Sequence, residues 1–103
     1  MKQDSVLSMI GLAKRAGKVV SGEFSTEKAI KEKKAKLVIV SEDASNNTKK
    51  LFNNKCAFYK VPIIMYSDKE SIGHALGQTM RKSVGIIDDN FAQAIIEKFG
   101  GLD

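Results

Sequence analysis

The sequence is poor in several residue types on which specialised proteins depend. Its 103 residues include one cysteine, one proline, one histidine and no tryptophan. The single cysteine, Cys56, excludes an internal disulfide and suits a reducing compartment. One proline and eight glycines leave no material for a long linker. A metal site needs clustered ligands at set spacing, whereas the one histidine and one cysteine are scattered, so we expect no metal and no cofactor.

Long hydrophobic runs are also absent. The longest run, residues 37–40, is far shorter than the roughly 20 apolar residues that a membrane-spanning helix requires. Residues 2–4 are polar, and no apolar signal core follows them. The sequence therefore predicts a cytoplasmic protein without a membrane partner.

The overall composition is typical of a folded protein. Hydrophobic residues make up 43% of the chain and charged residues 28%, which are proportions of a globular domain rather than of a disordered segment. The length allows one domain, and no internal repeat or low-complexity segment is visible. We expect residues 1–103 to form a single domain.

The net charge of +5 is unevenly distributed along the chain. Residues 1–60 contain 13 Lys or Arg and 6 Asp or Glu, whereas residues 61–103 contain 4 and 6. A basic half favours a polyanionic partner or a negatively charged membrane surface. The alternative is an ordinary lysine-rich surface without a partner.

Helical and strand patterns alternate along the chain. In the first predicted helix, for example, Val6, Met9, Ile10 and Ala13 fall on one face. Residues 37–40 are apolar without alternation, which is typical of a strand buried on both faces. We predict five helices, at 5–16, 25–33, 47–59, 67–76 and 89–99, and four strands, at 18–20, 36–41, 63–66 and 83–87. This order predicts an α/β fold, a three-layer α/β/α sandwich.

The stretch of residues 21–30 reads as a turn that leads directly into a helix. Gly22 provides backbone freedom for the turn, and Ser25 is predicted to be the N-cap. Lys28 and Lys31 follow on the first turns. A helix N-terminus offers free amide donors and a partial positive charge, so this stretch could bind phosphate. An ordinary strand–helix turn with solvated lysines is the alternative.

A second loop, residues 78–83, also carries cations beside a predicted strand. If strands 18–20 and 83–87 are neighbours in the sheet, the two loops form one surface with basic side chains, turn amides and the apolar tips Phe24 and Met80. Proteins that recognise folded RNA need these groups, because the deep major groove of A-form RNA is closed to side chains. An exposed Phe24 could stack on an unpaired base. The pattern alone equally allows Phe24 to be a core residue.

Catalytic patterns are weak in this sequence. A Cys56–His74 dyad is conceivable, but Cys56 lies on the apolar face of a predicted helix, where buried and inert cysteines are usual. No phosphate-binding loop of the GxxxxGK type is present, and Gly11 and Gly17 do not match a dinucleotide-binding fingerprint. We therefore expect no enzyme and no small-molecule substrate.

Several segments together resemble the L7Ae family of kink-turn-binding ribosomal proteins. They are residues 22–30, 35–44, 61–62 and 72–77, and they occur in the family's order and spacing over nearly the whole chain. The opening segment, residues 11–22, is similar to the short bacterial branch of that family.

The resemblance implies a three-layer sandwich around a four-stranded mixed sheet, and binding to a sharply bent RNA duplex with sheared G·A pairs. It places the RNA contact on the turn and first helical turn after the first strand and on the loop before the last strand. Combined with the charge pattern, this predicts the following RNA-binding residues: Gly22, Glu23, Phe24, Ser25, Thr26, Lys28, Lys31, Thr79, Met80, Arg81, Lys82 and Ser83.

Two segments depart from the family pattern. Phe24-Ser25 stands where other members carry the Asn-Glu pair that reads the sheared base pairs. Arg81 and Lys82 occupy the last loop, which is more apolar in the other kink-turn binders.

Taken together, these features predict a non-catalytic, monomeric RNA-binding protein of ribosomal type, with structured RNA, in particular ribosomal RNA, as its partner. One alternative is an RNA-recognition module or small enzyme of RNA modification. Another is a protein adaptor in ribosome assembly that docks through Phe91, Ile95 and Phe99 of the last helix.

Overall fold

The computed structural model of the chain describes residues 4–102. Helices and strands alternate through that range, as the sequence predicted. The elements are α1 (Ser5–Arg15), β1 (Val19–Ser21), α2 (Glu23–Lys31), β2 (Leu37–Val40), α3 (Asn46–Tyr59), β3 (Ile63–Met65), α4 (Lys69–Ala75), β4 (Ser83–Ile86) and α5 (Asp89–Phe99).

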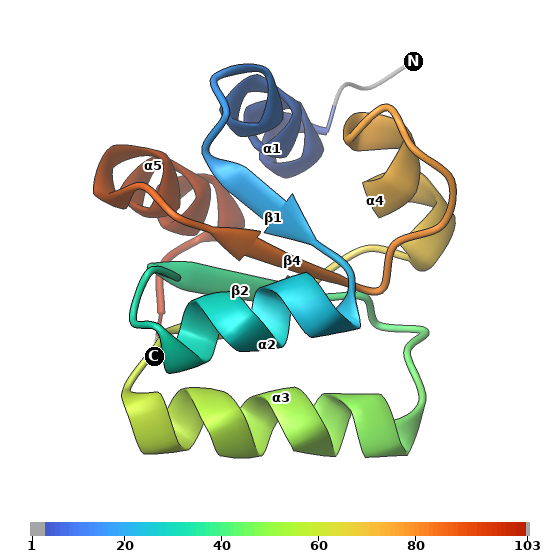
Figure 1. Cartoon of the computed structure of the whole chain (residues 1–103). Helices are drawn as coiled ribbons and strands as arrows, with labels where there is room; N and C mark the ends of the chain where they lie inside the picture. The colour runs from blue at the N-terminus through green and yellow to red at the C-terminus, as the bar shows by residue number, and fades with distance from the viewer. Residues whose placement is uncertain (1–3, 103) are drawn as a thin grey trace.

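The four strands form one mixed sheet in the order β1-β4-β2-β3. Strand β4 is antiparallel to both of its neighbours, β1 and β2, whereas β3 runs parallel to β2. Helices α1, α4 and α5 cover one face of the sheet, and α2 and α3 cover the other (Figure 1). The predicted three-layer α/β/α sandwich with a mixed sheet is confirmed.

Strand β2 lies between two separate apolar layers. Its residues alternate between the faces: Leu37 and Ile39 pack under α1, α4 and α5, while Val38 and Val40 pack under α2 and α3. All four are 0% exposed, which explains the uninterrupted apolar run in the sequence. The sheet therefore separates the side chains of α3 from those of α4.

Side-chain caps define the starts of four helices. An Asp or Ser oxygen accepts a hydrogen bond from the amide three residues ahead, as N-caps do. The capping residues are Asp4 for α1, Ser45 for α3, Asp68 for α4 and Asp88 for α5. Helix α4 begins at Lys69, so the predicted start at residue 67 is wrong. Ser67 adopts a left-handed conformation (φ +63°), and its carbonyl accepts the Glu42 amide at 2.8 Å.

Helix α2 begins earlier than the sequence predicted. Gly22, not Ser25, is its N-cap, with φ +91°, and its carbonyl accepts the Thr26 amide at 3.0 Å. The predicted Ser25 cap is wrong because the turn at Gly22 already brings the chain into helical geometry at Glu23. Ser25 consequently lies in the first helical turn.

None of the helices between residues 4 and 102 has the length and hydrophobicity that a membrane-spanning helix requires.

Candidate functional site

Pairing of β1 with β4 brings together the two loops that the sequence singled out. Val20 is opposite Gly85 and Ser21 is opposite Val84 in the antiparallel register. Beyond the ladder, the Gly22 amide donates to the Ser83 carbonyl at 3.0 Å. The predicted neighbourhood of the two strands is confirmed. We call the resulting region, residues 22–28 and 79–83, the two-loop surface.

A groove runs between the two loops, and other elements complete its wall. Thr48 of α3 and Lys69 of α4 line it together with residues 21–23 and 80–83. The sequence analysis did not include Thr48 or Lys69. Both residues reach the groove because β2 and β3 are parallel, so the loops after the two strands meet at the same end of the sheet. Three cations, Lys69, Arg81 and Lys82, therefore converge on this groove.

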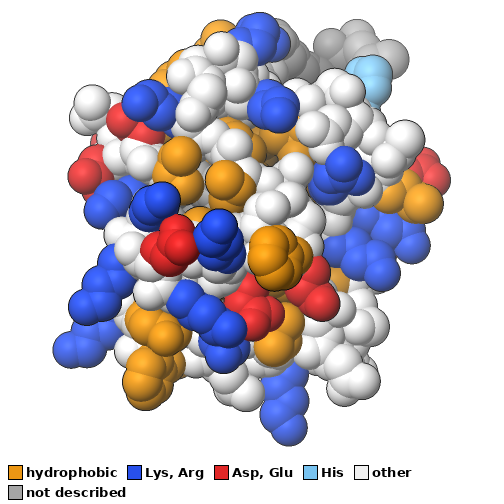
Figure 2. All heavy atoms as spheres, in the orientation of Figure 1, with side chains coloured by type: hydrophobic (Ala, Val, Ile, Leu, Met, Phe, Trp, Pro, Cys, Tyr) orange, Lys and Arg blue, Asp and Glu red, His pale blue; other side chains and the backbone are white. Residues whose placement is uncertain are grey.

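The N-terminal end of α2 forms the other side of the groove. Gly22 has no side chain to cap the helix, so the amides of the first helical turn have no partner inside the helix. Phe24 is 79% exposed on this turn, which decides the open alternative: Phe24 is not a core residue. Lys28 is exposed one turn further along the same helix face. Figure 2 shows an exposed apolar side chain near the middle of this face, with both acidic and basic side chains around it.

Charges of both signs occupy the exposed face of α2. Lys31 forms an ion pair with Glu27, with 3.0 Å between Nζ and Oε1, so part of its charge is already balanced. Glu23 is exposed and lines the groove. Its carboxylate suits the positive end of the helix dipole. It would repel a phosphate, but it can accept a hydrogen bond from a base.

Two of the predicted contact residues are buried. Thr26 is 0% exposed and Ser83 is 1% exposed, so neither side chain is available to a ligand. Both support the surface instead. Thr26 lies between α2 and the sheet, where Gly85 leaves room for its methyl group, and the Ser83 carbonyl holds the Gly22 amide.

The loop before β4 is held in place by its own hydrogen bonds. The Arg81 amide donates to the Lys69 carbonyl at 3.0 Å, and the Lys82 carbonyl accepts the Ser41 amide at 2.9 Å. The Arg81 guanidinium donates to the Met80 carbonyl at 2.9 Å and to Ser21 Oγ at 3.4 Å. Met80 remains 53% exposed at the tip. The cation and the apolar tip are thus presented in a fixed arrangement.

The start of α4, which carries Lys69, is fixed by carboxylates. The Lys69 amide donates to Asp43 Oδ1 at 3.0 Å, and Asp68 accepts from the amide and hydroxyl of Ser71 at 2.8 and 3.0 Å. The two hydrogen bonds from Ser71 hold the pKa of Asp68 below its usual value of 3.8, and the bond from the Ser71 amide has the larger effect.

Asp68→Ala is expected to lower the thermal unfolding midpoint at neutral pH. A carboxylate whose pKa is lowered by folding stabilises the protein above its unfolded pKa, and the contribution is lost as the pH falls through the folded pKa. The wild-type and Asp68→Ala midpoints should therefore converge as the pH falls through the lowered pKa of Asp68. In the control Asp68→Asn, which keeps a capping oxygen without titrating, the difference from Asp68→Ala should not change with pH. A gap between wild type and Asp68→Ala that persists in acid would contradict this assignment.

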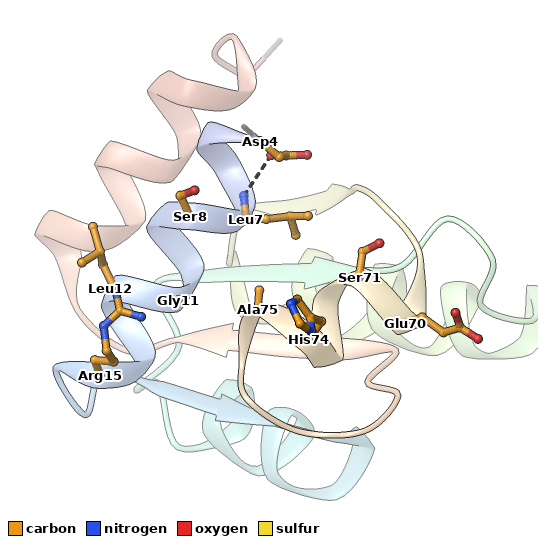
Figure 3. A pocket seen from close by; sticks show the side chains of 10 residues that line it. All are labelled: Asp4, Leu7, Ser8, Gly11, Leu12, Arg15, Glu70, Ser71, His74 and Ala75. Carbon is orange, nitrogen blue, oxygen red and sulfur yellow. Dashed lines mark hydrogen bonds between the residues drawn. The ribbon is translucent and has the colours of Figure 1, made fainter. Parts of the chain in front are cut away.

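Another hollow lies outside this surface, between α1 and α4. It has a volume of about 940 Å³, and Figure 3 shows Arg15, His74 and Ser71 among its lining side chains. The Ser71 hydroxyl donates to Asp68 rather than to His74. Among residues 4–102, no cluster of three or more His, Cys, Asp or Glu could hold a metal ion.

The Cys56–His74 dyad is excluded by the fold. Cys56 is buried between α3 and the sheet, whereas His74 is exposed on α4, on the opposite side of the sheet. Burial raises the pKa of the Cys56 thiol to about 11, so it is a protonated core residue at neutral pH.

The last helix uses its apolar face for the core. Ile95 is 0% exposed, and Phe91 packs against the same buried cluster. Phe99 contacts the Tyr66 ring edge-on, with 5.9 Å between ring centroids. The three residues considered for a partner-docking face are therefore engaged within the domain.

Comparisons with known proteins identify a matching family and similar sequences. The sequence profile of the ribosomal protein L7Ae/L30e/S12e/Gadd45 family matches residues 4–97. The chain is 43% identical over 88 residues to the RNA-binding protein YlxQ of Bacillus subtilis, covering 85% of this chain and 88% of that protein. It is 39% identical over 99 residues to the RNA-binding protein YlxQ of Enterococcus faecium, covering 96% and 95%.

Two solved structures show the same architecture. A protein of unknown function from Bacillus halodurans C has a TM-score of 0.90 at 32% identity, covering 93% of this chain and 97% of that one. The Giardia lamblia 15.5kD RNA binding protein has a TM-score of 0.79 at 18% identity, covering 97% and 89%. The latter similarity concerns the fold.

Proposed function

The chain belongs to the ribosomal protein L7Ae/L30e/S12e/Gadd45 family, and from this premise we propose that it is a non-catalytic RNA-binding protein that acts as a single domain. The two-loop surface is the proposed RNA-binding site. One observation carries this proposal: the β1–β4 pairing brings the open N-terminal end of α2, with the exposed Phe24 on its first turn, next to the groove that the cations of the second loop line. The relatives named as RNA-binding proteins support the choice of ligand.

Each part of the surface has a role toward RNA. The free amides at the start of α2 and the cations Lys28, Lys69, Arg81 and Lys82 suit phosphate oxygens. Phe24 and Met80 offer apolar area to bases that are not stacked in a helix. Glu23 would accept a hydrogen bond from a base edge. Such a mixture fits a structured RNA with exposed bases better than a regular duplex, whose major groove is closed to side chains.

The proposed target is a kink-turn element of ribosomal RNA. Support comes from the family resemblance, in which Gly22 and Lys28 occupy the family's positions, and from the family's ribosomal members. Phe24 and Ser25 replace the Asn-Glu pair of other members. We propose that the Phe24 ring stacks on a displaced base and that the exposed Ser25 hydroxyl takes part in hydrogen bonding. Cys56, the only cysteine of the sequence, is a buried free thiol, which fits the cytoplasmic setting proposed here.

A binding titration at two salt concentrations tests this function. The probes are a kink-turn hairpin and the same hairpin with its G·A pairs replaced. We expect tight, salt-dependent binding of the first and markedly weaker binding of the second. Equal binding of both would contradict kink-turn recognition while leaving RNA binding in place. Failure to bind either RNA at low salt would contradict the proposed function as a whole.

Lys28→Ala is expected to weaken binding of the kink-turn hairpin about fivefold, because one phosphate contact is lost. The slope of log K against log salt concentration should also become smaller by about one, because one fewer counterion is released on binding. Lys98→Ala is the matched control, since Lys98 is an exposed lysine on α5, on the other face of the sheet. Equal salt slopes for wild type and Lys28→Ala would remove Lys28 from the proposed site.

A further inference from the structure

A second basic region lies at the end of the sheet opposite to the two-loop surface, where strands β2 and β3 begin. Helix α2 leads into β2 and α3 leads into β3, and these strands are parallel neighbours with Val38 opposite Ile63. The Val38 amide donates to the Pro62 carbonyl at 2.9 Å. The C-terminal ends of α2 and α3 therefore lie side by side, at the left in Figure 1, whereas the two-loop surface lies at the far ends of these helices. We call Lys33, Lys34, Phe58 and Lys60 the distal patch.

Each of these two helices is followed by a lysine in an unusual backbone conformation. Lys33 and Lys60 are left-handed, with φ +60° and +59°, a conformation that is unfavourable for a residue with a Cβ atom. Glycine is the usual residue at such helix ends. The chain follows this rule elsewhere: Gly17, Gly77 and Gly100 follow α1, α4 and α5 with positive φ. Lysine replaces glycine only at the two helix ends that meet in the distal patch.

The helix dipole accounts for only part of this choice. A cation near a helix C-terminus is favourable, and α3 has no basic residue in its last turn apart from Lys60 at its C-cap. Helix α2, in contrast, already has Lys28 and Lys31 in its last turn. Lys33 therefore adds a strained backbone position to a helix end that is already compensated.

An exposed aromatic ring completes the distal patch. Phe58 is 77% exposed, and its ring is held edge-on against Tyr59, with 4.9 Å between centroids. Among residues 4–102, the ion pairs are Lys31–Glu27 and Lys34–Glu32, so Lys34 has an acidic partner within the chain, whereas Lys33 and Lys60 form no ion pair. Figure 2 shows basic side chains at the left edge of this face and apolar ones below them.

Cations around an exposed aromatic ring are what a single nucleic-acid strand requires, because the backbone follows the charges and an unstacked base lies on the ring. We propose that the distal patch binds single-stranded RNA that flanks the structured element held at the two-loop surface. This inference rests on the proposed function. Helix α3, with 14 residues, separates the two regions by roughly 20 Å, and the exposed Lys31 of α2 lies between them.

The test compares three RNAs: the kink-turn hairpin alone, the hairpin with an eight-nucleotide single-stranded uridine extension at its 5′ end, and the hairpin with the same extension at its 3′ end. For the wild-type protein, we expect one of the extended RNAs to bind roughly tenfold more tightly than the hairpin. Phe58→Ala and the double variant Lys33→Gly/Lys60→Gly should each remove this advantage and leave binding of the hairpin unchanged.

A measurement of the unfolding temperature distinguishes RNA binding by Lys33 and Lys60 from a purely structural role of these lysines. Because glycine relieves the left-handed strain, Lys33→Gly/Lys60→Gly should unfold at the same temperature as wild type or higher while losing the extension advantage. No advantage of either extension in the wild type, or an advantage that survives both variants, would overturn the inference. A distal patch that instead mediates self-association, seen by sedimentation and lost in Phe58→Ala without an RNA effect, would also overturn it. The proposed function fails separately, if the hairpin itself is not bound.

Discussion

Gly73→Ala is expected to be among the most damaging single substitutions outside the apolar core, lowering the free energy of unfolding by about 3 kcal/mol and RNA affinity by more than tenfold. Gly73 is buried in α4 beneath the loop that leads to β4. A Cβ atom at this position would overlap the Thr79 carbonyl oxygen and lie 3.1 Å from Met80 Cα. Both neighbours are backbone atoms, so the loop itself must move.

Displacement of this loop would reach the proposed site directly. The Gln78 amide donates to the Gly73 carbonyl at 2.8 Å, and the Arg81 amide donates to the Lys69 carbonyl. Both hydrogen bonds hold the segment that presents Met80 and Arg81. Urea unfolding and hairpin titration measure the two effects.

Gly11→Ala is the graded control for Gly73→Ala. A Cβ at Gly11 would meet the Ala75 carbonyl oxygen at 3.1 Å, a tight contact that a small shift between α1 and α4 can relieve. It should cost less stability than Gly73→Ala and leave RNA affinity nearly unchanged. Equal effects of the two substitutions would show that the loop is not held as described.

Phe24→Ala is expected to weaken binding of the kink-turn hairpin by about 1–3 kcal/mol, or roughly five- to 150-fold, through the loss of one base–aromatic stacking contact. The protein's stability should change little, because the ring is 79% exposed and outside both buried clusters. The salt dependence should also be preserved, since no charge is removed. Isothermal titration of both proteins at two salt concentrations measures these quantities.

Leu12→Ala is the matched control for Phe24→Ala. Leu12 is an exposed apolar residue, 45% accessible, on α1 beside the cavity between α1 and α4. Its removal should leave RNA affinity within about twofold of wild type. If Phe24→Ala behaves like Leu12→Ala, the exposed ring has no part in binding, and the proposed replacement of the Asn-Glu pair by stacking fails.

The layers of the fold could be predicted because local patterns were consistent with the tertiary structure. The uninterrupted apolar run of residues 37–40 indicated a doubly covered strand, and β2 is buried on both faces. The start of α2 was predicted wrongly because the prediction used only the local capping preference of Ser25, whereas a contact with the distant residue Ser83 determines where the helix begins. The Gly22 amide is fixed by the Ser83 carbonyl, which sets the end of β1 and starts the helix before Ser25.

The proposed site could be predicted only in part. The two loops were identified because each carries cations beside a strand. Lys69 and Thr48 were missed because they join the groove only through the strand order β1-β4-β2-β3, which no sequence pattern determines. The role of Gly73 was likewise invisible, although the glycine itself belongs to the segment that resembles the family. Position 73 requires glycine because the backbone of Thr79, six residues further along the chain, lies against it.

The most direct test of the account is the change in backbone amide NMR shifts of the wild-type protein when the kink-turn hairpin is added. The largest changes are expected at residues 22–28 and 79–83 and at Lys69, with little change along α5. Large changes confined to α5 or to the cavity between α1 and α4, with none at the two-loop surface, would contradict the proposed RNA-binding site.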